Sequence, residues 1–336
     1  MKKRFLIVMT MMILPLCGLS AIDLFIEDND LKAEINLDFS QGFYASYEDW
    51  NLWILAPEFG LELIGEKGPV KIESALDFSG LFTGEYNEIL KKAALYWDIN
   101  DDIQICLGQF KSPFGFEIQR GQSKRPYSGH SLSSKKMAPG YSRGASFKTK
   151  DFLSLLDIEA GLFNGGKISD EDSTLTKLLA AGSLSAGLEL SSIAYIMIGY
   201  SGFLNSFFLP AYYYQFGQSL CLQVDLNFGS KNDFTFFAEF MEHLDDSLAL
   251  NHHPLWSHGL FTSLEFRISA FEPFISAEHY KENLMLWSSD DSLKGSAGCN
   301  VYLEDDIKIQ GQYNLTLTYL DGFLNHEIEL NFFYSL

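Results

Sequence analysis

The residues Lys32–Ser40, with the sequence KAEINLDFS, alternate strictly between polar and apolar side chains. A period of two is the repeat of a β-strand with two different faces. Turn residues such as Gly, Pro, Asn and Asp separate further alternating segments, and no stretch has convincing helical periodicity. The clearest of these segments are 70–78, 95–99, 103–107, 220–228, 307–317 and 328–334. The sequence therefore predicts an all-β protein with about 16 strand-like segments.

The N-terminus has the features of an export signal. Basic residues at 2–4 precede the apolar run 5–16, and small residues follow that run. This order is typical of a cleaved signal peptide. Lipid attachment at Cys17 is the alternative, although the Leu directly before that residue fits a lipidation motif poorly. We expect a signal peptide at 1–20 and a single mature domain at 21–336.

Two architectures accommodate so many alternating strands. A soluble sandwich or solenoid buries the apolar face in a core, whereas a membrane barrel turns it toward lipid and lines a lumen with the polar face. Segments of about 10 to 13 residues suit a tilted membrane strand, and aromatic residues cluster at their ends as in a girdle. The final segment, Ile328–Leu336, has large apolar residues in one parity, which resembles the signal read by the barrel-assembly machinery. We therefore expect a closed transmembrane antiparallel β-barrel of about 16 strands, with its terminal strands paired, in contact with outer-membrane lipids.

The alternation also assigns the two faces of the wall, because a shift of one residue would place carboxylates in hydrocarbon. The polar positions predicted to face the lumen are Glu34, Asn36, Asp38, Gln223, Asp225, Gln310 and Gln312. The apolar positions predicted to face lipid are Ile35, Leu37, Leu222, Val224, Ile309 and Leu315. Further acidic residues with lumen parity are Glu239, Glu265, Glu327 and Glu329.

Charge is distributed very unevenly along the chain. The 336 residues carry a net charge of −20, which disfavours nucleic acid as a partner because phosphates would be repelled. The stretch 108–150 nevertheless has Glu117 as its one acidic residue. A basic block in an acidic protein indicates an anionic partner. The basic residues of the stretch are Lys111, Arg120, Lys124, Arg125, Lys135, Lys136, Arg143, Lys148 and Lys150.

The most specific motif is GQFKSPFGFE at 108–117. It resembles the G-x-F-K-x-P-F-G-x-E signature of the phosphate-selective porin O and P family. A second similarity follows, where Arg143-Gly144 opens a strand and the segment AGLFNG at 160–165 closes the next. The resemblance implies a 16-stranded, usually trimeric barrel, in which basic residues guide anions through a constriction. Outside the range 107–165 it rests on strand layout alone.

The physics of the motif favours a loop that folds into the barrel. Pro113 removes a hydrogen-bond donor from the sheet and Gly115 permits a sharp bend. About thirty residues then separate this break from the next strand, and a loop of that length in a porin often narrows the lumen. Basic side chains in such a constriction select ions, whereas on an external loop they would be solvated. The residues assigned to the anion pathway are Lys111, Arg120, Lys124, Arg125, Lys135, Lys136 and Arg143.

Motifs for enzymatic chemistry are weak. The sequence contains no G-x-S-x-G, Walker or dinucleotide-binding motif. The histidines and aspartates of 245–258 fall in a predicted external loop without ligand spacing. The later cysteines, Cys106, Cys221 and Cys299, form neither a disulfide framework nor a metal cluster. We therefore expect no enzyme, metal or cofactor.

The function that this sequence predicts is a water-filled porin for passive diffusion of small anions or polar solutes, phosphate among them. The alternative is a barrel without transport activity, whose external loops bind host or neighbouring molecules. In that case the loops 121–142 and 245–258 would carry the function.

Overall fold

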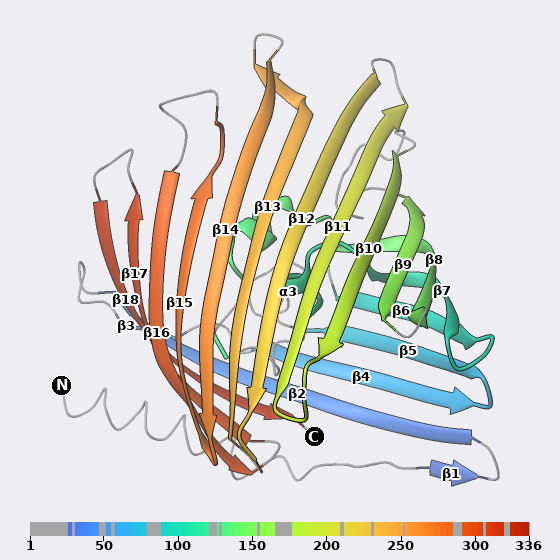
Figure 1. Cartoon of the computed structure of the whole chain (residues 1–336), viewed down its shortest axis with the longest axis horizontal. Coiled ribbons are helices and arrows are strands. Elements are labelled where there is room, and N and C mark those ends of the chain that lie inside the picture. Colours follow the sequence, from blue (N-terminus) through green and yellow to red (C-terminus); the bar gives the residue numbers. More distant parts are fainter. Residues whose placement is uncertain are drawn as a thin grey trace.

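A computed structural model describes most of the chain as one antiparallel sheet of 18 strands (Figure 1). In the helices that it describes, none combines the length and the apolar composition needed to cross a membrane. The residues predicted as a signal peptide lie outside the described part. The described residues are 26–28, 31–46, 52–54, 58–78, 89–120, 126–127, 130–152, 155–164, 177–208, 212–229, 232–250, 253–284, 291–304, 307–318 and 323–335.

Long strands form the wall, and two short strands, β1 (Ile26–Asp28) and β3 (Leu52–Ile54), pair beside the first of them. The long strands are β2 (Leu31–Ser46), β4 (Glu58–Lys67), β5 (Val70–Asp77), β6 (Leu90–Asp98), β7 (Ile103–Lys111), β8 (Tyr141–Phe152), β9 (Leu156–Asn164), β10 (Lys177–Glu189), β11 (Ala194–Phe208), β12 (Tyr212–Asn227), β13 (Asn232–Leu250), β14 (His253–Ile268), β15 (Phe271–Lys281), β16 (Asp291–Glu304), β17 (Ile307–Thr318) and β18 (Phe323–Ser335).

The sheet closes on itself. Each long strand pairs with the next one in the chain, and β18 pairs with β2, so that Glu327 lies opposite Ser46 and Ser335 opposite Asp38. Without β1 and β3, the 18-stranded sheet is a ring of 16 antiparallel strands. The predicted barrel, with paired terminal strands, is confirmed.

The two faces of the wall follow the predicted parity wherever side chains are described. Gln310 and Gln312 are buried on the inside, and Gln223 contacts an inner segment of the chain. Leu222, one residue away from Gln223, is 37% exposed on the outer face. For the positions 34–38, the strand is described but the side chains lie outside the description.

The predicted external loop at 245–258 is wrong. β13 continues to Leu250 and β14 begins at His253, and Asp245 pairs with Leu255 across the two strands. Most of this part of the chain therefore belongs to the two strands of a hairpin. Composition alone cannot separate these cases, because a strand that continues past an apolar band is polar too.

Candidate functional site

The segment 112–140, here called the inner segment, leaves the wall after β7 and returns to it at β8. It contains two short helices, α3 (Phe116–Gln119) and α4 (Leu132–Met137), which lie within the ring (Figure 1). Gly115 has a φ of 73°, and its N–H donates to Ser201 Oγ of β11 at 3.0 Å. The predicted inward fold of the loop after GQFKSPFGFE is therefore confirmed.

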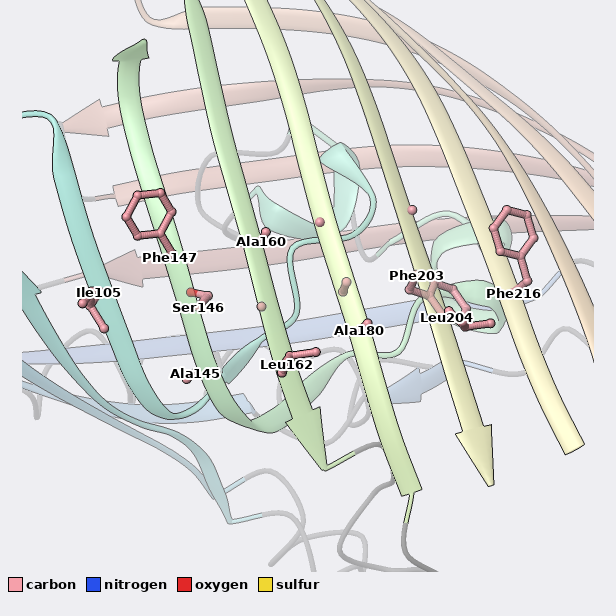
Figure 2. A pocket seen from close by; sticks show the side chains of 14 residues that line it. Ile105, Ala145, Ser146, Phe147, Ala160, Leu162, Ala180, Phe203, Leu204 and Phe216 are labelled. Atoms are coloured by element: carbon pink, nitrogen blue, oxygen red, sulfur yellow. The ribbon is translucent and has the colours of Figure 1, made fainter. Parts of the chain in front are cut away.

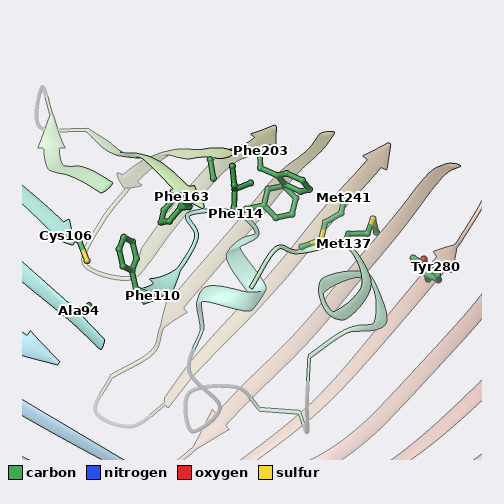
Figure 3. Packing of buried hydrophobic residues seen from close by; sticks show 11 residues of the cluster. Ala94, Cys106, Phe110, Phe114, Met137, Phe163, Phe203, Met241 and Tyr280 are labelled. Atoms are coloured by element: carbon green, nitrogen blue, oxygen red, sulfur yellow. The ribbon is translucent and has the colours of Figure 1, made fainter. Parts of the chain in front are cut away.

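One apolar cluster attaches the inner segment to strands between β6 and β15 (Figure 3). The ring of Phe114 meets Phe203 of β11 edge to face, with centroids 4.8 Å apart. Met137 of α4 and Met241 of β13 belong to the same cluster. Such aromatic pairs are worth about 0.5–1.5 kcal/mol beyond their buried area, so this contact contributes to holding the segment against the wall.

A second apolar cluster packs Tyr127 of the inner segment against β12–β15. The ring of Tyr127 lies 4.8 Å from that of Phe261 on β14. The carbonyl of its neighbour Pro126 accepts hydrogen bonds from Asn300 Nδ2, at 3.0 Å, and from Gln310 Nε2. The inner segment therefore contacts the wall as far as β17.

Glu239 of β13 holds the start of α3. Its carboxylate accepts the backbone N–H of Phe116 at 2.8 Å, that of Glu117 at 2.7 Å, and the hydroxyl of Ser219. The side chain is 1% exposed. A buried carboxylate needs such donors, because an ion without them is very costly to bury. Glu239 therefore fastens the segment and does not line open lumen.

Two more carboxylates complete the fastening. Glu117, fully buried, accepts from Ser131 N at 2.7 Å and from the hydroxyls of Ser131 and Ser134, which ties α3 to α4. Glu278 of β15 accepts from Ser133 N at 2.9 Å. Beside it, a Cβ at Gly259 would collide with the side chain of Ser133, so a residue without a side chain is required at this close approach.

Arg120 also points to this side of the lumen. Its guanidinium donates to Gln223 at 2.7 Å and lies 3.5 Å from Glu265 of β14. It stacks over Phe237, with its Cζ atom 4.3 Å from the ring centroid. The charges of Arg120 and Glu265 therefore offset each other against the wall.

Open space remains on the opposite side, between the inner segment and β4–β9. A cavity of about 320 Å³ lies there. Three lysines line it, together with the tyrosines Tyr96 and Tyr141 and the carboxylates of Glu62 and Glu159. The lysines are Lys92, Lys111 and Lys148.

The three lysines have different contacts, since two approach carboxylates and one approaches a backbone carbonyl. Lys92 forms an ion pair with Glu73, which Lys71 also contacts at 2.7 Å. Lys148 lies 3.9 Å from Glu159, which is long for an ion pair. Lys111 donates to the carbonyl of Ile118 at 2.7 Å, and its ammonium lies 5.7 Å from the ring centroid of Tyr141. This arrangement can attract an anion and donate hydrogen bonds to it.

The other residues assigned to the anion pathway lie elsewhere. Lys135 and Lys136 are exposed on α4. Arg143 is exposed and does not line the cavity, and its Nε donates to Gln109 at 3.1 Å. Lys124 and Arg125 lie outside the described residues.

Sequence reasoning missed the roles of Lys92, Glu239 and Glu278. The sequence did contain a sign that the inner segment covers part of the wall. Phe203, Phe237 and Phe261 are apolar residues at lumen parity. In an open channel those positions would be polar. Within the described residues, no group of His, Cys, Asp and Glu is arranged to hold a metal ion.

Solved structures share this arrangement of strands. The anion-selective porin from Comamonas acidovorans matches with a TM-score of 0.65 and 11% identity, over 91% of this chain and 100% of that one. OmpF of Salmonella typhi, in complex with daunomycin, matches with a TM-score of 0.65 and 12% identity, over 93% and 100%. The outer membrane channel DcaP of Acinetobacter baumannii matches with a TM-score of 0.60 and 9% identity, over 94% and 100%.

The fold is therefore that of the outer-membrane β-barrel porins. At these identities the likeness establishes the fold alone. No protein-family model matches the chain, and no curated protein is similar to it in sequence.

Proposed function

We propose that this chain is an outer-membrane porin, which lets small anions or polar solutes diffuse passively through the space between the inner segment and β4–β9. The observation that carries the proposal is the lysine-lined cavity on the open side of a lumen whose other side is filled. Cations at a narrow, partly dehydrated passage select ions strongly. Solved structures of the same fold include proteins described as an anion-selective porin and as a channel.

Phosphate is the solute that the motif at 108–117 suggests, through its resemblance to the phosphate-selective porin O and P family. Lys111 is the basic residue of that motif, and it lines the cavity together with Phe110. We further propose that residues 1–20 are a signal peptide, that 21–336 form one exported domain, and that the barrel assembles as a homotrimer in the outer membrane.

Planar-bilayer recording tests the channel. The folded, purified chain should give stepwise conductance, and the reversal potential in a potassium chloride gradient should indicate a preference for chloride. Phosphate should reduce the chloride current if it occupies the same passage. Heat-unfolded protein provides the control. Folded barrels without conductance would contradict the porin and favour an anchor for external binding loops.

A further inference from the structure

Two oppositely charged side chains face each other across β8 and β9 in the lysine-lined cavity. Lys148 lies directly opposite Glu159, and both side chains line the cavity. Their nearest charged atoms, Nζ and Oε2, are 3.9 Å apart, and the side chains keep 39% and 23% of their surface exposed. An exposed pair at this distance gains little from its own attraction, so both charges remain available to a solute.

The alternation of β8 and β9 explains why this pair faces the lumen. Ala145 and Phe147 of β8 and Ala160 of β9 line an apolar hollow of about 700 Å³ on the outer face of the wall (Figure 2). Lys148 and Glu159 are the next neighbours of these residues along their strands, so they have the opposite parity. The wall therefore separates the charged pair from lipid and presents it to the passage.

Neighbouring groups keep the two charges from closing onto each other. Ser146 donates its hydroxyl to Oε1 of Glu159 at 3.1 Å, which holds one side of that carboxylate. On the other side of Lys148, its partner Gln104 on β7 donates to Asp98 at 2.8 Å. The pair therefore offers one ammonium group and one carboxylate oxygen at a fixed separation.

The charged groups of an α-amino acid match this pair. They are bonded to one carbon, so the ammonium nitrogen and the carboxyl carbon lie about 2.5 Å apart. With the carboxylate beside Lys148 and the ammonium beside Glu159, each charge of the solute lies next to an opposite charge of the wall. A charge-assisted hydrogen bond can then form at each end.

The rest of the cavity suits the body of a small organic molecule. Its volume of about 320 Å³ is at the lower end of the range of about 300–1,000 Å³ that is typical of small-molecule pockets. The rings of Tyr96, Phe110 and Tyr141 line it beside the charged groups. An amino-acid side chain can therefore lie against aromatic surface while its charged end contacts β8 and β9.

We propose that the passage favours zwitterionic solutes of the α-amino-acid type over neutral solutes of the same size, and that Lys148 and Glu159 recognise them. The inference rests on the proposed porin function and names a solute class for the same cavity. A neutral solute matches neither charge, whereas an anion is attracted by Lys148 and repelled by Glu159. Small anions still enter, because the lining has three lysines and two carboxylates.

Tracer exchange in proteoliposomes tests the proposal with three solutes that have the same number of heavy atoms. Alanine is a zwitterion, its isomer lactamide is neutral, and lactate is an anion. Each is isotope-labelled and present at equal concentrations inside and outside, and protein-free liposomes give the background. We expect alanine to exchange at least threefold faster than lactamide, with a smaller advantage in about 1 M salt, where the Debye length is about 3 Å.

Single variants give the test a direction that a loss of structure would not produce. Glu159→Gln should slow alanine to the rate of lactamide and speed lactate, because the repelling carboxylate is gone. Lys148→Gln should slow alanine and lactate together. The matched control is Glu189→Gln, at an exposed wall position that does not line the cavity, and it should leave the ratios unchanged.

The outcomes separate this inference from the porin itself. If all three solutes exchange and alanine is no faster than lactamide, the zwitterion preference is wrong and the porin stands. If none exchanges above the background, the porin is wrong and this inference falls with it. A Glu159→Gln variant that slows all three solutes alike would also overturn the proposal. The comparison of the two isomers needs only the unmodified chain, so it decides the question even where a variant fails to fold.

Discussion

The two sides of the lumen treat their charges in opposite ways. Along β12–β15, Glu239, Glu265 and Glu278 are covered by the inner segment and are matched by backbone N–H groups or by Arg120. Along β4–β9, three lysines line a cavity together with the carboxylates of Glu62 and Glu159. Glu239, Glu265 and Glu278 are therefore acidic residues of lumen parity that do not line the passage as free carboxylates.

Removing the carboxylate of Glu239, which accepts the N–H groups at the start of α3, should change conductance and stability most. Glu239→Ala leaves two backbone N–H groups and a hydroxyl without their partner, at about 1–3 kcal/mol for each buried group. We expect the inner segment to detach, with several-fold larger and noisier single-channel conductance and a lower unfolding temperature. Glu189→Ala, at an exposed wall position, is the control. Unchanged conductance in Glu239→Ala would mean that the apolar clusters alone hold the segment.

Adding a side chain at Gly259, where the backbone of β14 lies against Ser133 of α4, should have the next largest effect on conductance. Gly259→Leu introduces a side chain where Ser133 already lies. We expect displacement of α4 and a rise in conductance, which is smaller than for Glu239→Ala because α3 keeps its own contacts. Gly295→Leu is matched to it, since a Cβ at Gly295 meets nothing within 4 Å. Equal behaviour of the two variants would contradict the fastening of α4.

Neutralising the open side should change selectivity and leave stability nearly unaltered. The triple variant Lys92→Gln, Lys111→Gln, Lys148→Gln removes the cations of the cavity. One charge at 4 Å in water is worth about 1 kcal/mol, so we expect the anion-to-cation permeability ratio to fall about fivefold. Reversal potentials in a salt gradient give this ratio directly. If they stay the same, solutes take another route.

The exposed lysines of α4 provide a finer test. Lys135→Gln with Lys136→Gln removes two charges that lie outside the lysine-lined cavity. We expect a less than twofold change in the permeability ratio, and a change that disappears at high salt because the Debye length falls to about 3 Å at 1 M. An effect as large as that of the triple variant would place the selective step at α4.

Alternation in the sequence predicts most of this fold. Segments such as 307–317 and 328–334 identify their strands, because lipid and water impose opposite demands on successive residues. Pro113 and Gly115 likewise indicate where the chain leaves the wall. Alternation and chain breaks are local properties, so they can be read from a single sequence.

The candidate site is harder to predict, since it depends on which distant residues meet. Lys92 and Lys148 come from β6 and β8 and face the same cavity only in the closed ring. Glu239 has the same parity as any acidic residue of an open channel, and only the position of α3 shows that it is covered. Basic composition drew attention to Arg143, which is exposed, is hydrogen-bonded to Gln109 and is absent from the lining of the cavity.

The pairing of β18 with β2 has a consequence for how this protein folds. The contact that closes the ring joins residues near opposite ends of the chain, such as Ser335 and Asp38. Rates of folding fall as the sequence separation of contacts grows, because the entropy of a very long loop must be lost before the contact forms. Until β18 has been synthesised and delivered, β2 keeps an unpaired edge that could add a strand from another chain. We therefore expect assembly to be slow and to need protection against aggregation until the first and last strands meet.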